Sequence, residues 1–147
     1  MRAFNCGGLM LALTLMTVPA SAQSGTNERT VRIIAGGSEL KATLNDTAAS
    51  RDLMTLLPLH LQMTDYNGAE KIAKLPKGLS AAGAPDGADP NVGDIAYYAP
   101  WGNFVVYYGD VQYWPGIVPL GHVEGSLNPF AGQGAVDVRI ERLEPSK

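Results

Sequence analysis

The chain has 147 residues, with 14 acidic and 11 basic side chains and a formal net charge of −3 at pH 7. This mildly acidic balance, without a basic patch, argues against nucleic acid as a partner. The single cysteine, Cys6, excludes a scaffold held by internal disulfides, so the hydrophobic core must stabilise the fold.

The N-terminal stretch predicts an export signal. Arg2 precedes an apolar run, Leu9–Val18, and the small residues of Pro19–Ala22 follow it. Because the run is far shorter than the ~20 residues that cross a bilayer, we expect cleavage after Ala22 and no membrane anchor in the mature protein. Cys6 would be removed with the signal, and the mature chain would carry a net charge of −4 (10 basic minus 14 acidic). We therefore expect a periplasmic or secreted protein.

The remaining sequence predicts one domain. Residues 23–29 are polar and indicate a flexible leader, residues 30–143 form the domain, and residues 144–147 form a short tail. The domain is long enough to bury a useful core without metals or disulfides.

The domain is predicted to begin with a β-hairpin. Thr30–Ala35 is rich in β-branched residues, and Glu39–Leu44 alternates between apolar and polar positions. Gly36-Gly37 supplies the turn between these two antiparallel strands.

One short helix follows the hairpin. The apolar stripe predicts it over about Thr47–Leu57, with Asn45 or Asp46 as the N-cap. Pro58 ends it, because proline cannot continue the backbone hydrogen bonding of a helix.

A second strand pair is predicted after the helix. Leu59–Thr64 alternates strictly, Asp65–Gly68 supplies turn chemistry, and Glu70–Leu75 returns. The alternation predicts three inward side chains: Leu59, Leu61 and Met63. We expect a solvated strand edge to carry three lysines: Lys71, Lys74 and Lys77. The Gly, Ala, Pro and Asp residues of Leu79–Val92 predict a long surface loop.

The next hairpin is predicted to be central. It pairs Ile95–Ala99 with Phe104–Tyr108 around the corner Pro100–Asn103. Because Phe104–Tyr108 is apolar without a polar alternate, we expect both faces of this strand to be covered.

The last third continues the β pattern. Val111–Trp114 is predicted to extend a strand, Pro115-Gly116 to turn, and Val118–Val123 to return to the core. After a loop at Ser126–Gln133, Val136–Leu143 alternates as a closing strand. So many strands with one helix predict a mainly β fold, a small closed antiparallel β-barrel, because closure removes exposed sheet edges.

An ordered series of short motifs from about Thr30 to Leu143 resembles the bacterial cyclophilin-like domain family. The series comprises Leu56–Leu59, Leu61–Met63, Asp65–Lys71, Leu75-Pro76, Gly93–Tyr97, Pro100, Gly102-Asn103, Tyr108-Gly109 and Leu120–Val123. The resemblance implies a cyclophilin-type β-barrel in a family whose biochemical role is largely undefined.

Peptidyl-prolyl isomerisation is the activity that the resemblance raises. Twisting an X-Pro bond requires a hydrophobic pocket and a positioned hydrogen-bond donor, which is an arginine in true cyclophilins. No arginine of the mature chain stands in the matching Phe-His-Arg context: Arg29, Arg32, Arg51, Arg139 and Arg142. We therefore assign no catalytic residue and keep an unconventional isomerase as the alternative.

Metal and cofactor sites are not predicted. His60 and His122 are the only histidines, and a zinc site would need carboxylates brought in by folding. Asp86, Asp89 and Asp94 lie in a turn-rich loop without EF-hand spacing, so we interpret them as turn residues. Neither a phosphate loop nor a dinucleotide fingerprint is present.

The remaining candidate for function is an aromatic cluster: Tyr97, Tyr98, Trp101, Tyr107, Tyr108, Tyr113 and Trp114. These rings either fill the barrel or line a recognition groove where loops gather. For the groove we select four rings and three polar orienting groups: Trp101, Trp114, Tyr97, Tyr113, Glu70, Asp94 and His122.

The sequence thus predicts an exported cyclophilin-like protein that binds a small ligand or peptide without catalysis. The alternatives are an isomerase with an unconventional site and a protein-interaction module of the cell envelope.

Overall fold

The structure is a computed structural model of the chain and describes residues 29–144. The predicted export signal, most of the predicted leader and the last three residues of the tail lie outside the described residues. Within residues 29–144, no helix combines the length and the apolar character needed to cross a membrane.

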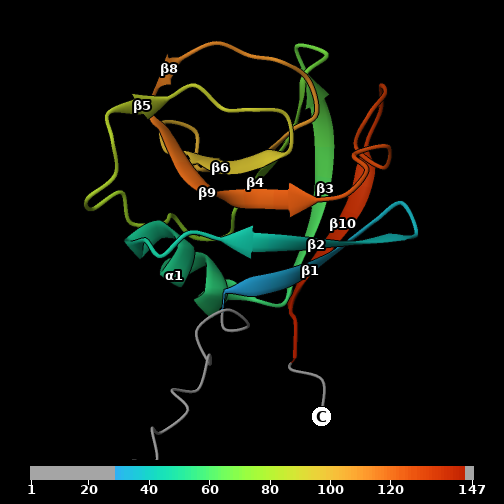
Figure 1. Ribbon diagram of the computed structural model, residues 1–147, viewed down its shortest axis with the longest axis horizontal. Coiled ribbons are helices and arrows are strands. Elements are labelled where there is room, and N and C mark those ends of the chain that lie inside the picture. Colours follow the sequence, from blue (N-terminus) through green and yellow to red (C-terminus); the bar gives the residue numbers. More distant parts are fainter. Residues whose placement is uncertain (1–28, 145–147) are drawn as a thin grey trace, which may run out of the picture.

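Eight strands form a closed antiparallel barrel in the order β1-β10-β3-β4-β7-β6-β9-β2 (Figure 1). This confirms the predicted fold class. A separate two-stranded ribbon pairs β5 with β8 at one end of the molecule. The elements are β1 (Thr30–Ala35), β2 (Ser38–Leu44), α1 (Ala48–Leu56), β3 (Leu59–Tyr66), β4 (Glu70–Lys74), β5 (Gly87–Ala88), β6 (Asp94–Tyr98), β7 (Asn103–Tyr107), β8 (Trp114–Pro115), β9 (Ile117–Glu124) and β10 (Val136–Arg142).

The helix α1 has a different cap from the one predicted. Thr47 is the N-cap, and its hydroxyl oxygen accepts a hydrogen bond from the Ser50 backbone N–H at 3.2 Å. The Asn45 backbone N–H donates to the Leu120 carbonyl, and the Asp46 carboxylate accepts from Arg51 at 2.8 Å. The prediction of Asn45 or Asp46 as the cap is therefore wrong, because the helix begins at Ala48 and Thr47 takes the N-cap position.

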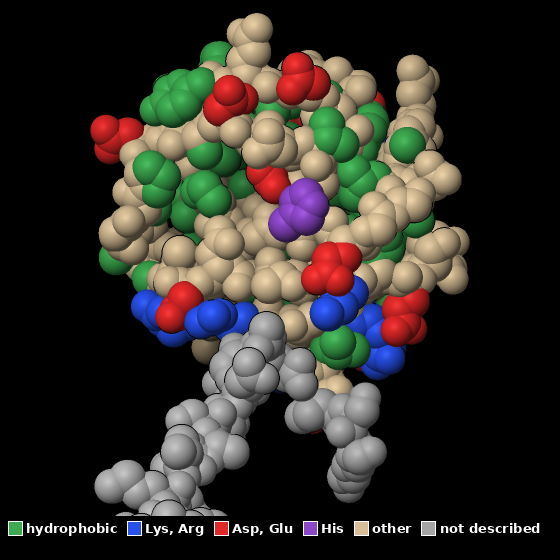
Figure 2. All heavy atoms as spheres, viewed as in Figure 1, with side chains coloured by type: hydrophobic (Ala, Val, Ile, Leu, Met, Phe, Trp, Pro, Cys, Tyr) green, Lys and Arg blue, Asp and Glu red, His purple; other side chains and the backbone are tan. Residues whose placement is uncertain are grey.

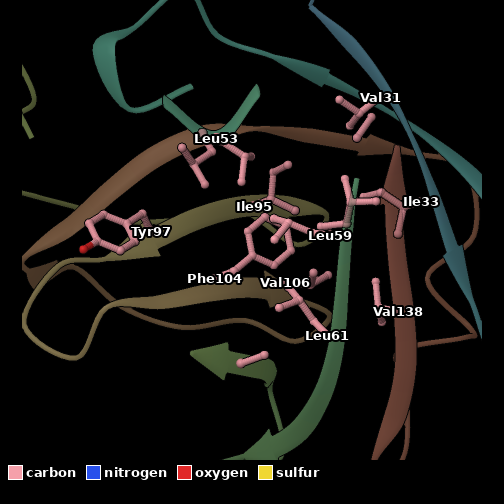
Figure 3. Packing of buried hydrophobic residues seen from close by; sticks show 14 of the residues in the cluster. Val31, Ile33, Leu53, Leu59, Leu61, Ile95, Tyr97, Phe104, Val106 and Val138 are labelled. Carbon is pink, nitrogen blue, oxygen red and sulfur yellow. The ribbon is translucent and has the colours of Figure 1, made fainter. Parts of the chain in front are cut away.

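The barrel interior follows the two-residue period of its strands. Figure 3 shows side chains from several strands and from the helix meeting there, among them Leu53, Ile95 and Phe104. The inward positions predicted for β3 are confirmed, because Leu59, Leu61 and Met63 are buried.

Strand β7 is covered on both faces, as predicted. Phe104 and Val106 belong to the barrel interior. Val105 and Tyr107 point to the outer side, where they form a second apolar cluster with Ile117. A segment of the chain outside the barrel therefore covers the outer face of β7.

The prediction that Val111–Trp114 extends a strand is wrong for most of this segment. No strand forms at residues 111–113, and only Trp114 enters one, the short β8 that pairs with β5 through Ala88. The reason is that the chain leaves the barrel after β7, so these residues lack a neighbouring strand in the wall, and Val111 packs on the second apolar cluster.

Lys71 is not part of a solvated edge, which contradicts the prediction for that residue. It is 2% exposed, and its Nζ donates to the Asp65 carboxylate at 3.1 Å and to the carbonyls of Gly132 and Gly134 at 2.5 and 2.9 Å. The Tyr108 hydroxyl donates to the same carboxylate. This Lys71 network fastens the loop before β10 to β3 and β4. The other two lysines of the predicted edge are exposed: Lys74 and Lys77.

Candidate ligand-binding cleft

A cleft of about 430 Å³ lies on the outer side of the barrel wall. Its floor comes from β4, β6 and β7, and its walls come from the turn after β3, the corner after β6 and the segment that leads through β8 into β9. This volume falls within the range of small-molecule sites.

Strand register sets the floor of the cleft. Glu70 lies opposite Tyr107 and Ile72 lies opposite Val105, so these four side chains share the outer face of the β4–β7 pair. Asn103, two residues before Val105, continues the same row. The floor is therefore apolar in its centre and polar at both ends.

Aromatic rings form the walls. The Trp101 ring meets the rings of Tyr66 and Tyr98 edge to face, with centroids 5.5 and 5.2 Å apart. The indole N–H of Trp114 donates to the Tyr98 hydroxyl oxygen at 3.2 Å. Trp101 is 47% exposed and Trp114 is 60% exposed, so both have free ring surface beside the cleft. The contacts hold the rings in one arrangement before any ligand is present.

Gly116 brings Trp114 close to Tyr98. Its φ of +85° is unfavourable for other residues, and an added Cβ would lie 2.8 Å from the ring of Pro100. Its carbonyl accepts from the Ala99 backbone N–H at 3.0 Å. The turn after β8 is thereby fixed against the corner after β6.

Glu70 and Tyr107 are polar groups without protein partners at the cleft floor. Within residues 29–144, neither the Glu70 carboxylate nor the Tyr107 hydroxyl has a hydrogen-bond or ion-pair partner. Burial raises the pKa of Glu70. Burial, with the nearby Glu70 carboxylate as the next cause, also raises the pKa of Tyr107, which is 2% exposed. Both groups have unused capacity to bind a ligand.

Acidic groups outnumber basic ones around the cleft. Glu70 and Asp110 line it, and no lysine, arginine or histidine of residues 29–144 does. Lys74 lies on the same face of β4 but outside the lining. In the view of Figure 2, Lys and Arg side chains lie near the lower end of the molecule, with Asp and Glu side chains among them. No Lys or Arg side chain shows around the opposite end, where Figure 1 places β5 and β8 and where acidic and hydrophobic side chains are visible.

The structure divides the predicted site residues between different places. Trp101, Trp114 and Glu70 come together in the cleft. Tyr97 is 5% exposed and points into the barrel (Figure 3). Tyr113 is 55% exposed and does not line the cleft.

Asp94 and His122 lie together at a second, smaller pocket of about 180 Å³. His122 Nδ1 is 2.8 Å from an Asp94 carboxylate oxygen, and the second carboxylate oxygen accepts from the Asn91 backbone N–H. The pair is therefore anchored to its own loop and is not brought to the cleft. In the part of the chain that the structure describes, no group of three or more His, Cys, Asp or Glu residues could hold a metal ion.

Among the cleft residues that were absent from the predicted site are three rings and a carboxylate: Tyr66, Tyr98, Tyr107 and Asp110. Tyr98 and Tyr107 could have been selected by combining the expected cover on both faces of Phe104–Tyr108 with the two-residue period of strands. Tyr66 and Asp110 carry no such signal, because their position depends on how the turn after β3 and the segment after β7 fold over the wall.

No arginine in the described part of the chain reaches the cleft. The five arginines of the described residues lie in β1, α1 and β10 or just before β1: Arg29, Arg32, Arg51, Arg139 and Arg142. A donor of the kind that true cyclophilins use is thus not provided by arginine at this site.

Comparison with known proteins identifies a matching family and a solved structure with a similar fold. Residues 33–141 match the cyclophilin-like family. The solution structure of the hypothetical protein AF2241 from Archaeoglobus fulgidus is similar, with a TM-score of 0.58 and 16% identity, covering 83% of this chain and 100% of that chain. At this identity the likeness concerns the fold alone. The chain matches no curated protein.

Proposed function

The chain belongs to the cyclophilin-like family, and from that premise we propose that it is a binding protein that holds a small ligand or a peptide segment in the outer cleft without catalysis. The observation that carries this proposal is the joint presence of exposed rings and unpartnered polar groups in one cleft. Clefts with apolar walls and a few convergent polar groups are the usual form of ligand sites.

The lining supports binding better than chemistry. Within residues 29–144, no serine, cysteine, histidine, lysine or arginine lines the cleft, so carboxylates and tyrosine hydroxyls are the only common catalytic groups there. Glu70 is half-buried and has no side chain that activates or orients it among the described residues. Rigid rings and a half-buried carboxylate without a partner among the described residues favour recognition.

Fragment mapping by amide chemical shifts tests the proposed site. We would titrate the labelled protein with a set of small aromatic, aliphatic and charged fragments and with proline-containing peptides. We expect the saturable shifts to gather in residues 66–72 and 98–117. Shifts that gather around Asp94 and His122, or no saturable shift anywhere, would contradict the proposed site.

A proline-isomerisation assay separates binding from the isomerase alternative. We expect the rate for a proline-containing tetrapeptide to equal the uncatalysed rate, since no arginine of residues 29–144 lines the cleft as a donor. Acceleration that Trp101→Ala abolishes would support an enzyme instead.

We also propose that the protein acts outside the cytoplasm, on the strength of the apolar run and small residues in residues 1–22. Expression of the full chain in a bacterial host, followed by fractionation and intact-mass measurement, checks this. The expected product is extracytoplasmic and begins at Gln23. A full-length product in the cytoplasm would contradict it.

A further inference from the structure

We propose that the cleft selects its ligand through a positively charged group, an alkylated ammonium ion, held between the aromatic walls and the Glu70 carboxylate. The inference rests on the proposed function, because it names the chemistry of the ligand that the same cleft takes.

The ring walls favour a cation. The faces of tryptophan and tyrosine rings are electron-rich and attract positive charge, with tryptophan the strongest. Trp101, Trp114, Tyr66 and Tyr98 line one cleft, and the edge-to-face contacts of Trp101 fix three of these rings relative to one another. Because the arrangement exists before binding, little side-chain freedom is lost when a ligand enters.

The charges of the cleft have one sign. Glu70 and Asp110 contribute carboxylates, and none of the basic side chains that the structure describes lines the cleft. The basic side chains visible in Figure 2 lie at the other end of the molecule from β5 and β8. A cleft lined by one sign of charge concentrates ligands of the opposite sign and disfavours anions.

The Glu70 carboxylate makes the cleft prefer a cation over a neutral ligand of the same shape. It is half-buried and lacks a donor among the described residues, and the nearest ammonium along the strand, that of Lys71, is bound to Asp65 and two carbonyls. A neutral ligand would cover the carboxylate and deepen its loss of hydration, whereas a cation compensates the charge. The cleft therefore selects a cation over a neutral ligand, because a neutral ligand would leave the Glu70 carboxylate covered and without a compensating charge.

An alkylated ammonium ion fits better than a primary one. A primary ammonium has three N–H donors that need acceptors; Glu70 and Tyr107 on the floor can accept, but the ring faces that make up the walls supply none. A trimethylammonium group has no such donors, presents methyl groups to the rings and keeps its charge at every pH. The exposed ring surface of Trp101 and Trp114 matches that requirement.

Three probes of nearly equal shape test the inference: choline, its neutral isostere 3,3-dimethylbutan-1-ol, and the anion 3,3-dimethylbutanoate. Tryptophan fluorescence is a direct readout, because both tryptophans of the chain line the cleft. We expect choline to bind roughly five- to thirtyfold more tightly than the alcohol at pH 7, and the anion to bind most weakly.

Two variants with the same change in net charge complete the test. Glu70→Gln should bring the affinities of choline and the alcohol toward each other and leave the affinity for the alcohol within about twofold, since only the charge is removed. Asp137→Asn is the matched control, because Asp137 is exposed on β10 and does not line the cleft. It should leave the preference for choline unchanged.

The outcomes separate this inference from the proposed function. Equal affinity of the wild-type protein for choline and the alcohol, or an equal loss of preference in both variants, would overturn the cation inference and leave the cleft as a binding site. No saturable signal from any probe up to its solubility limit would overturn the inference together with the proposed function.

Discussion

Glu70 and Lys71 are neighbours on β4, but their side chains lie on opposite sides of the barrel wall and differ in whether their charge has a partner. Lys71 points inward and donates to three acceptors, so its buried charge is compensated. Glu70 points outward into the cleft, half-buried, with no donor among the described residues.

The difference shows how the same strand serves stability on one face and binding on the other. A buried charge with all its partners holds segments together, and removing one partner is costly. A half-buried charge without a protein partner lowers the stability of the fold, but it remains free to bind an oppositely charged group of a ligand. The four predictions that follow test this contrast.

The largest effect is expected from Lys71→Met. The substitution leaves the Asp65 carboxylate and the carbonyls of Gly132 and Gly134 without their donor, and we expect a loss of about 3 kcal/mol in the free energy of unfolding. Chemical denaturation measures it. The control is Lys74→Met on the exposed face of the same strand, which should change stability by less than about 0.5 kcal/mol. Equal losses in the two variants would show that the Lys71 network does not stabilise the fold.

Trp101→Ala should weaken the binding of choline by about tenfold or more, because it removes the ring that contacts two others in the wall. Since the side chain is half exposed, stability should fall by no more than about 1 kcal/mol. The measurements are a binding titration followed by Trp114 fluorescence and a denaturation curve. Tyr113→Ala, an exposed ring outside the cleft, is the control and should leave binding unchanged.

Tyr108→Phe should cause a smaller loss than Lys71→Met, a few degrees in Tm, because it removes one donor from Asp65. The hydrogen bond to Asp65 raises the pKa of Tyr108 to about 12 and lowers the pKa of Asp65. A lowered native pKa means that this stabilisation is present above the ordinary value of 3.8 and is lost as pH falls through the native value. The difference in Tm between the two proteins should therefore shrink in acid. A difference that stays constant down to pH 2 would contradict this role.

Glu70→Gln should have the smallest effect and the opposite sign, a gain of about 0.5 kcal/mol at pH 7. Because burial raises the native pKa of Glu70 above its ordinary 4.5, the folded protein binds more protons than the unfolded chain as pH passes between these values. The gain should be absent well below pH 4.5, grow through that window and stay constant above it. Denaturation curves across pH 3–8 measure it, and a loss of stability at pH 7 would show that Glu70 has a partner in solution.

Much of the fold could be predicted because it follows from local pattern. The alternation of Leu59–Thr64, the proline that ends α1 and the double cover of β7 are each visible in a few consecutive residues. Closure into a barrel follows from the number of strands and the need to remove sheet edges.

The site could be predicted only in part, because it depends on register and on segments far apart in sequence. Nothing local places Glu70 opposite Tyr107, or separates Asp94 and His122 from the two tryptophans. The burial of Lys71 likewise requires two carbonyls more than 60 residues away, since its partners are Gly132 and Gly134.

The most direct test of the account is a crystal structure of the protein grown with choline. The account predicts the trimethylammonium group in the outer cleft, against the ring faces of Trp101 and Trp114 and within contact of the Glu70 carboxylate. Choline bound instead beside Asp94 and His122, or an outer cleft closed by its own side chains, would contradict it.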